Sequence, residues 1–526
     1  FDGAWLVQNF ENLNPANTLW SKQFNLWANV DTEADRYLGF EKWWGGHVTL
    51  NAEEMQFIVD ELFIGNHLAS GEIRGRDGTE MDLRNIASPI VCFCSRGDNI
   101  TPPQQALDWI LDLYDSVDDI RANGQTIVYA IHDTIGHLGI FVSAGVARKE
   151  HDEFASNIDL IDVLPPGLYE AVFAPRAEAG DDEFIHGDWV MRIEARTLED
   201  IRDMGGNTPE DEKRFEAAAK LSEMNLALYR TFAQPWVRAV TNPQLAETMR
   251  KLHPLRLGFE MFASQNPFMA WVQPAAEKLR ENRHEVGPDN PLLDWQKAAS
   301  DKIVEALEAW REAVERLSEE TFLAVYGNEV LQKAVGVDPE STVDPRHAPK
   351  RLLHRQLVER RIAELRAAFG KGGIREATLR ALLYAGRVRG AVDERGFEAI
   401  RRFRRTEHGK AARSLAEFKQ LVRDQYLMLL IDEQAAMAAL PGLLPEDEAI
   451  RRLAVNIIRD VLGASSPIEP DVERRLAEVQ RLFGLPEAQV PLAADSAPAA
   501  VDARVEKSPA SRTPRQRGAS NGRRRA

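Results

Sequence analysis

Two residues suited to acid–base chemistry follow two apolar runs of the sequence. Asp98 comes shortly after the run 88–94 (SPIVCFC), and His137 comes shortly after the run 125–131 (QTIVYAI). Continuous apolar runs of this length are typical of parallel strands that helices cover on both faces. Functional side chains gather where such strands end, at the carboxyl edge of the sheet. The sequence therefore predicts that Asp98 and His137 lie close together at this edge.

A carboxylate that hydrogen-bonds a histidine fixes its tautomer, so that the histidine can act as a general base toward a nucleophile. In α/β-hydrolases the chain order is nucleophile, acid, histidine, and Asp98 precedes His137 in the same way. A pair that works like this should have its side chains within about 3 Å of each other. The alternative is structural: Asp98 caps a turn or helix, and His137 is an ordinary loop residue.

The segments around the two residues alternate between predicted strands and helices. Residues 101–103 (TPP) should begin a helix with Thr101 as its N-cap, because Thr caps helices well and Pro suits the first turn. Leu107 and Ile110 continue this helix at helical spacing, and a second helix should follow the polar turn 132–136. Strands and helices that alternate with short connections indicate an α/β fold with a parallel sheet.

Length and composition indicate several folded domains. The chain has 526 residues, of which 44% are apolar and 28% charged, which excludes a wholly disordered or fibrous protein. No run of 18 apolar residues occurs, so no membrane span is expected. The absence of a signal peptide and the presence of only two cysteines favour a cytoplasmic location. Because the first residue is Phe1 rather than Met, we expect a fragment or a processed chain.

Charge is distributed unevenly along the chain. Residues 1–200 carry 13 basic and 35 acidic side chains, whereas residues 501–526 carry 8 basic and 2 acidic ones. Nucleic acid binds non-specifically to positive surfaces, so the acidic front is not expected to bind it. The basic end could bind a polyanion only weakly. Its Ala, Pro, Ser and Arg content predicts a disordered tail.

Four regions follow from these patterns. Residues 1–64 hold five of the eleven tryptophans and should form irregular loops and short helices, either as a cap over an apolar cleft or as a packed corner of a core. Beyond Gly205 the pattern is helical, with a proline-rich linker at 338–350. The expected boundaries are an α/β unit at 1–175, a helical domain at 205–335, a second helical domain at 351–485 and a disordered basic tail at 486–526.

Four segments resemble poly(3-hydroxyalkanoate) synthases, in the C-terminal half of their catalytic domain, and a bacterial family of synthase-like proteins. They are GDNITPP (97–103), GHLGIFVS (136–143), WWGGHVTLNAEEMQFIVDELFIGN (43–66) and MDLRNIASPIV (81–91). The resemblance covers about residues 1–165. It implies a partial α/β-hydrolase fold with a parallel sheet. The helical periodicity and the composition described above add two all-α domains and a disordered basic tail.

The resemblance also implies a function. Asp98 and His137 would be the acid and the base of an acyltransferase that acts on hydroxyacyl-CoA thioesters, with a growing polyester or water as the acceptor and with no cofactor or metal. The family's nucleophile is a cysteine in a Gly-x-Cys-x-Gly turn, which is absent from this sequence. We expect it upstream of Phe1, so that this chain alone is inactive. Cys92 and Cys94 should be small buried residues. Ser143 is a poor candidate nucleophile, because it comes after His137 and lacks the first glycine of such a turn.

Two other interpretations remain open. The long helical extensions favour a catalytically silent scaffold that binds a granule, a protein partner or a second copy. The other interpretation is a metal site, although the spacing of the candidate ligands matches no common zinc site. These candidates are His132, Asp133, His137, His151 and Asp152.

Residues 372–485 faintly resemble the tellurite-resistance B-like helical domain. That family carries an Asp-Gly acid suited to metal in each half, where this sequence has Arg389-Gly390 and Ser465-Ser466. No metal site is therefore expected here. Three nearby acids should be solvated helix charges, namely Asp393, Glu398 and Glu473.

Overall fold

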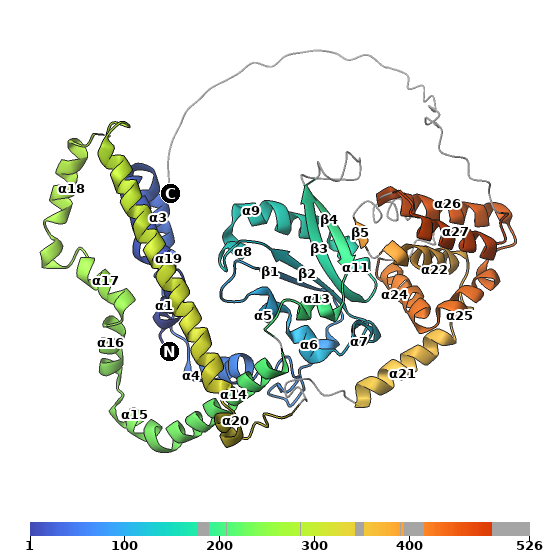
Figure 1. The fold of residues 1–526 in the computed structure, drawn as a ribbon, viewed down its shortest axis with the longest axis horizontal. Helices are drawn as coiled ribbons and strands as arrows, with labels where there is room; N and C mark the ends of the chain where they lie inside the picture. Colours follow the sequence, from blue (N-terminus) through green and yellow to red (C-terminus); the bar gives the residue numbers. More distant parts are fainter. Residues whose placement is uncertain are drawn as a thin grey trace, which may run out of the picture. The chain divides into compact units, whose positions relative to one another are not determined.

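Five short strands form one sheet in the computed structural model, which describes residues 1–175, 189–206, 208–284, 286–341, 352–389, 391–393, 415–465 and 467–486. Along the sheet the strands lie in the order β1 (Ile90–Ser95), β2 (Thr126–His132), β3 (Gly167–Pro175), β4 (Trp189–Ala195) and β5 (Ala391–Asp393) (Figure 1). The first three strands are parallel, and the last two pair antiparallel. The sheet is thus mostly parallel, as the sequence predicts for an α/β fold.

The register of β1 and β2 brings the ends of the two predicted runs together. Ile90 pairs with Ile127 and Ser95 pairs with His132, so that both strands finish at the same level. The loops that carry Asp98 and His137 therefore leave the sheet side by side at its carboxyl edge.

Helices cover both faces of the sheet, as apolar parallel strands require. On one face Ile127 and Tyr129 meet a buried cluster from α5 (Pro103–Leu107), α6 (Trp109–Leu113), α7 (Val117–Ala122) and α13 (Leu198–Arg202). On the other face Val128 and Ala130 meet apolar residues of α10 (Asp152–Ser156) and α11 (Ile158–Val163). Alternate residues of β2 thus enter different cores, because successive side chains of a strand point to opposite faces.

The helix predicted to begin at Thr101 differs from the expectation in two ways. Pro102 rather than Thr101 occupies the N-cap position of α5, and the helix is interrupted at Asp108 before α6 begins. The prediction of Thr101 as the N-cap was wrong because its hydroxyl donates instead to the Asp98 side chain. The second predicted helix is a series of short turns: α8 (Gly139–Val142), α9 (Ala144–Val146) and η4 (Ala147–His151).

The aromatic-rich first 64 residues are more helical than predicted. They form α1 (Ala4–Leu13), η1 (Asn17–Ser21), α2 (Lys22–Ala28), α3 (Val30–Trp44), α4 (Ala52–Phe57) and η2 (Ile58–Ile64). The Trp20 indole N–H donates to Ser300 Oγ over 2.9 Å. Arg256 donates through Nε and Nη2 to the two oxygens of Asp2. Polar contacts therefore tie this segment to helices more than 200 residues away in the sequence.

Residues 209–335 are helical, as predicted, but a separate domain with its own core is not confirmed. The helices are α14 (Pro209–Leu228), η5 (Tyr229–Ala233), α15 (Gln234–Val240), α16 (Pro243–Lys251), α17 (Pro254–Phe262), η6 (Pro267–Met269), α18 (Val272–Glu281), α19 (Pro291–Tyr326) and α20 (Glu329–Val335). Each buried apolar cluster found among the described residues draws its members from other parts of the chain. A periodic apolar pattern specifies a helix, but it does not specify what covers the apolar face.

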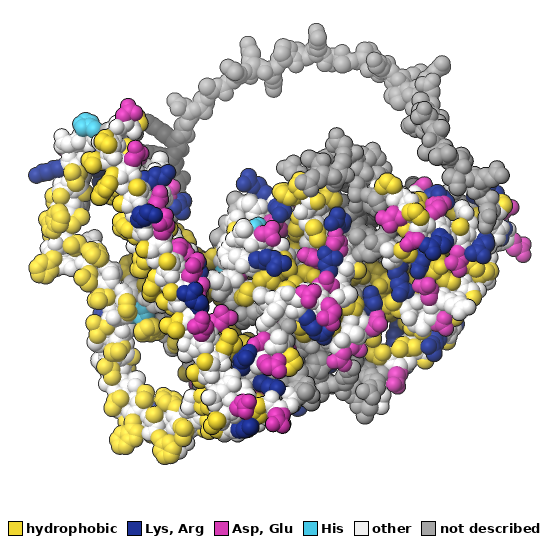
Figure 2. All heavy atoms as spheres, in the orientation of Figure 1, with side chains coloured by type: hydrophobic (Ala, Val, Ile, Leu, Met, Phe, Trp, Pro, Cys, Tyr) yellow, Lys and Arg dark blue, Asp and Glu magenta, His cyan; other side chains and the backbone are white. Residues whose placement is uncertain are grey.

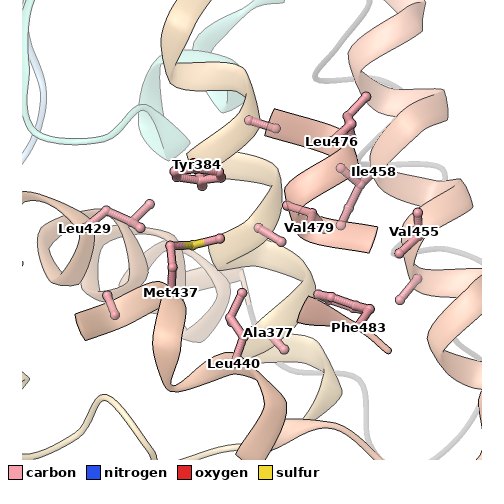
Figure 3. Close-up of a cluster of buried hydrophobic side chains, with 14 of the residues drawn as sticks. Ala377, Tyr384, Leu429, Met437, Leu440, Val455, Ile458, Leu476, Val479 and Phe483 are labelled. Carbon is pink, nitrogen blue, oxygen red and sulfur yellow. The ribbon is translucent and has the colours of Figure 1, made fainter. Parts of the chain in front are cut away.

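The C-terminal helices pack around a large apolar cluster (Figure 3). Ala377, Ile458 and Phe483 are fully buried there. The contributing helices are α22 (Ile374–Gly386), α24 (Leu415–Ile431), α25 (Glu433–Ala438), η8 (Leu440–Leu443), α26 (Glu448–Ser465) and α27 (Pro470–Leu482). α21 (Leu352–Arg366) adds Leu365. The helical content predicted for 351–485 is therefore largely present.

One element of this region contradicts the all-α prediction. Strand β5 pairs with β4, through Ile193 with Val392 and its neighbours, and so extends the sheet of the first region. Asp393, predicted as a helix charge, belongs to this strand. An unpaired edge strand exposes backbone N–H and C=O groups, and β5 satisfies those of β4. Lys419 also forms an ion pair with Asp162 of α11.

Several predictions fall outside the described residues. These are Gly390, Glu398, Ser466, most of the linker at 338–350 and, apart from Pro486, the tail at 486–526. Glu473 is among the described residues. It pairs with Arg459 at 2.8 Å, and both side chains are partly exposed, as expected of a solvated charge. Among the helices that are described, none combines the length and the apolar character needed to cross a bilayer.

Candidate functional site

Asp98 and His137 meet at the carboxyl edge of the sheet. Asp98 Oδ2 lies 2.8 Å from His137 Nδ1, so the contact predicted from the sequence is present. The Asp98 side chain is fully buried, and that of His137 is 26% exposed. A carboxylate accepts hydrogen bonds, so Nδ1 carries the proton and donates it. This leaves Nε2 of the neutral ring as the basic nitrogen.

The loop after β1 holds the Asp98 carboxylate in place from the other side. Oδ1 accepts the backbone N–H groups of Ile100 at 2.8 Å and Thr101 at 3.0 Å. Oδ2 also accepts the Thr101 hydroxyl at 2.8 Å. Four donors thus converge on one buried carboxylate, which is well oriented before any ligand arrives.

These donors outweigh burial in setting the charge of Asp98. Burial raises the pKa of the carboxyl group, but the hydrogen bonds from Thr101, His137 and Ile100 favour the ionised form, and the net pKa is lowered. A carboxylate whose pKa is lowered by folding stabilises the fold above its ordinary pKa of 3.8. That stabilisation is lost as the pH falls through the lowered value.

Asp98→Asn should therefore reduce the free energy of unfolding at pH 7, and the difference from the wild type should shrink below pH 3.8. Urea denaturation followed by circular dichroism at both pH values measures it. Asp203→Asn, at an exposed position, is the control and should show no difference at either pH. A gap that stays constant with pH would mean that the Asp98 charge does not stabilise the fold.

The aromatic N-terminal segment reaches the other side of the histidine. The Phe10 ring of α1 stacks on the His137 ring, with centroids 6.1 Å apart and planes at 15°. Trp44 lies beside Phe10, 6.2 Å away, and its indole N–H donates to Glu11 Oε1 at 2.6 Å. Phe10 of this segment thus contacts the Asp98–His137 pair, but the contact does not decide between the two roles weighed from the sequence, a cap over an apolar cleft and a packed corner of a core.

The thiols and hydroxyl considered as nucleophiles have other roles. Cys92 and Cys94 lie within β1, and burial raises the pKa of both thiols, that of Cys94 to about 12. A thiol with so high a pKa is a poor source of thiolate. Ser143 Oγ accepts the backbone N–H groups of Gly145 and Val146 at 3.2 and 3.4 Å, as a helix cap does.

The remaining histidines of the metal interpretation are also engaged. His132 Nδ1 accepts the N–H groups of Thr134 and Ile135, and the His151 ring packs edge-on against Phe93. Within the described residues, no three His, Cys, Asp or Glu side chains are placed to hold one metal ion. His132, the last residue of β2, instead lines a cavity of about 410 Å³ with Glu150 and Trp189.

Sequence reasoning missed two residues of the site. Thr101 contacts both partners, because its Oγ1 also lies 3.2 Å from His137 Nδ1. The spacing Asp-x-x-Thr in GDNIT is a local signal that could have identified it, since Asp side chains bond backbone N–H groups two and three residues on. Phe10 lies more than 100 residues from His137, and no local pattern links them.

The fold and the site define an α/β protein with a buried carboxylate–histidine pair at the carboxyl edge of its sheet. The chain belongs to the family described as Protein of unknown function (DUF3141), whose model matches residues 1–369. This match covers the sheet up to β4, the Asp98–His137 pair and the helices up to α21. It ends before residue 372, so the tellurite-resistance B-like resemblance of residues 372–485 stays a prediction.

Two curated relatives match the chain. The "Uncharacterized protein in ackA 5'region" of Rhizobium meliloti is 62% identical over 494 residues, which cover 94% of this chain and 67% of that protein. The "Poly(3-hydroxyalkanoate) polymerase subunit PhaC" of Haloferax mediterranei is 25% identical over 184 residues, which cover 34% of this chain and 32% of that protein. This second match supports a distant relationship to polyhydroxyalkanoate synthases. No solved structure matches.

Proposed function

We propose that Asp98 and His137 are the acid and base of an α/β-hydrolase-type acyltransferase that acts on hydroxyacyl-CoA thioesters. The observation that carries the proposal is the 2.8 Å hydrogen bond between the two side chains at adjacent strand ends. The distant similarity to a polyhydroxyalkanoate polymerase subunit supports the substrate class. The distance and the burial of the acid are those that a general base and its orienting carboxylate need.

The chemistry assigned to the pair is as follows. His137 Nε2 takes the proton of a nucleophile as that nucleophile attacks the thioester carbonyl. The carbon–sulfur bond breaks, an acyl-enzyme forms, and the proton passes to the departing CoA sulfur. Nε2 then takes the proton of an acceptor hydroxyl as its oxygen attacks the acyl-enzyme carbonyl. The bond between the acyl group and the nucleophile breaks, and Nε2 returns the proton to the departing nucleophile. In both steps the Asp98 carboxylate stabilises the imidazolium through Nδ1. This route uses no cofactor.

The nucleophile is assigned to a residue outside those that the structure describes. Among the described residues, no recorded hydrogen bond joins a serine or cysteine side chain to His137 Nε2. Ser143 caps a backbone turn. Of the two cysteines in β1, both predicted to be buried, Cys94 is buried and Cys92 is half-buried. The proposal therefore needs the protein as its native gene produces it.

The test is release of CoA from 3-hydroxybutyryl-CoA, followed by chromatography, with the protein produced from its native gene. His137→Ala should lower turnover by about 10³-fold or more, because no other base is placed to activate the nucleophile. Intact-mass measurement should show one hydroxybutyryl group on the wild type and none on the variant. His284→Ala, at an exposed position, should leave turnover unchanged.

A catalytically silent scaffold is the second candidate. Phe10 stacked on His137 and the absence of a recorded nucleophile contact among the described residues favour it. This reading predicts no CoA release from any hydroxyacyl-CoA of short or medium chain length. Turnover that survives His137→Ala would likewise contradict the acid–base role of the pair.

A further inference from the structure

The region between α14 and α19 exposes many large apolar side chains. This 229–284 segment contains η5, α15, α16, α17, η6 and α18. Figure 2 shows hydrophobic side chains gathered along these helices, at the left and lower left of the view. The most exposed aromatic residues of the segment are Phe232 at 68%, Trp236 at 76%, Phe262 at 72%, Phe268 at 83% and Trp271 at 66%. A soluble surface rarely presents so many neighbouring large apolar groups without a binding role.

The exposed side chains follow helical spacing, so each helix has one apolar face. Leu245, Met249 and Leu252 lie four and three residues apart along α16 and its C-cap, and they are 43–62% exposed. Val272 and Leu279 lie seven residues apart on α18, at 42% and 70%. Such stripes normally face a core. Here no described residue of the chain covers them.

One helix of the segment, α17, is held against the N-terminal helices by two of its residues. Arg256 of α17 pairs with Asp2, and His253, its N-cap, packs edge-on against Trp5 with ring centroids 4.3 Å apart. Met261 and Phe262, at the other end of α17, stay 51% and 72% exposed. The segment is thus held to the N-terminal helices by polar and histidine contacts, while its apolar residues remain outside.

The charge of the segment is opposite to that of the chain. Residues 229–284 carry 8 Lys and Arg against 4 Asp and Glu, whereas the whole chain has a net charge of −17. Arg238 and Arg280 are exposed, and no ion pair is recorded for either among the described residues. A net positive charge beside exposed Trp, Phe and Leu is the composition of helices that lie in a membrane interface.

We propose that the 229–284 segment docks on the surface of an anionic phospholipid bilayer. Its short amphipathic helices lie along the interface, with Trp236, Phe268 and Trp271 inserted among the acyl chains and the basic residues against the headgroups. A symmetric dimer through the same segment would bring two segments of net positive charge together, so the charge argues against a second copy as the occupant. The proposal is independent of the acyltransferase function.

The test is co-sedimentation of the full chain with vesicles of phosphatidylcholine alone or of phosphatidylcholine with phosphatidylglycerol. Binding should be at least about tenfold stronger to the anionic vesicles and should weaken as salt screens the charges. Phe268→Ser with Trp271→Ser should weaken it at least about tenfold, since the change removes two of the aromatic side chains that insert among the acyl chains. Arg238→Glu with Arg280→Glu should remove the preference for anionic lipid.

The matched control is Phe63→Ser with Trp27→Ser, which removes the same residue types at 75% and 65% exposure outside the segment. This control should bind anionic vesicles like the wild type. Equal binding of both double variants, or no binding of the wild type to anionic vesicles, would overturn the proposal. So would a concentration-dependent dimer that Phe268→Ser with Trp271→Ser abolishes, because the segment would then face a second copy. Circular dichroism shows that each variant is folded.

Discussion

Asp98→Asn should lower hydroxyacyl-CoA turnover by about 10⁴-fold while the chain stays folded. The reason lies in the donors around the side chain. Two backbone N–H groups, of Ile100 and Thr101, point at Oδ1, so an asparagine would keep its carbonyl oxygen there. Its amide nitrogen would then face His137 Nδ1. A donor at that place makes Nδ1 the acceptor and puts the ring proton on Nε2, where it blocks the base.

The measurement is CoA release by the protein from its native gene, together with the nitrogen chemical shifts of the His137 ring, which report its tautomer. Thr101→Val should cost only about tenfold, since it removes one hydrogen bond to Oδ2 and leaves that of His137 in place. Asp203→Asn is the exposed control. Full activity of Asp98→Asn, or an unchanged tautomer, would contradict the role given to the carboxylate.

Arg380→Met should destabilise the C-terminal helical core by about 3 kcal/mol, because it leaves buried acceptors without donors. Arg380 is fully buried on α22. Its guanidinium donates to the Phe369 and Ala436 carbonyl oxygens at 2.9 and 2.8 Å and to Gln425 Oε1 at 2.8 Å. Burial lowers the pKa of Arg380 to about 10, which records the cost of keeping this charge out of water.

Urea denaturation followed by circular dichroism measures the loss. Arg380→Lys should not restore stability, since a single ammonium cannot place donors toward three separated oxygens as the planar guanidinium does. Arg474→Met, at a side chain that is 76% exposed, should change the free energy of unfolding by less than about 0.5 kcal/mol. If Arg380→Met were as stable as the wild type, the prediction would be wrong. The gain from no longer burying a charge would then equal the loss of the hydrogen bonds.

The sequence could predict the centre of the α/β unit because its information there is local. The runs 88–94 and 125–131 are apolar after their first one or two residues, and they became β1 and β2 with shifts of one or two residues at their ends. Parallel strands that follow each other along the chain end at the same edge of a sheet. The nearness of Asp98 and His137 follows from this rule, before any side chain is placed.

Other features depend on pairings across long stretches of chain. Strand β5 has only three residues, and its partner β4 lies about 200 residues earlier in the sequence. No local pattern therefore predicts this pairing. Phe10 reaches His137 only because α1 folds over the loops. Arg380 lies in a helical sequence, where an arginine normally faces water, and only the packed helices show that it is buried.

The sequence by itself determined the α/β class, the two strands, the acid and histidine at their ends and the helical character of the rest, because each rests on the spacing of neighbouring residues. Tertiary structure decided which helical faces are covered. The periodicity of 229–284 and that of 374–482 look alike in the sequence, yet the second region packs around a common core and the first leaves its apolar faces exposed. An amphipathic pattern states that a face is apolar, and only the partners within reach of the folded chain decide what lies against it.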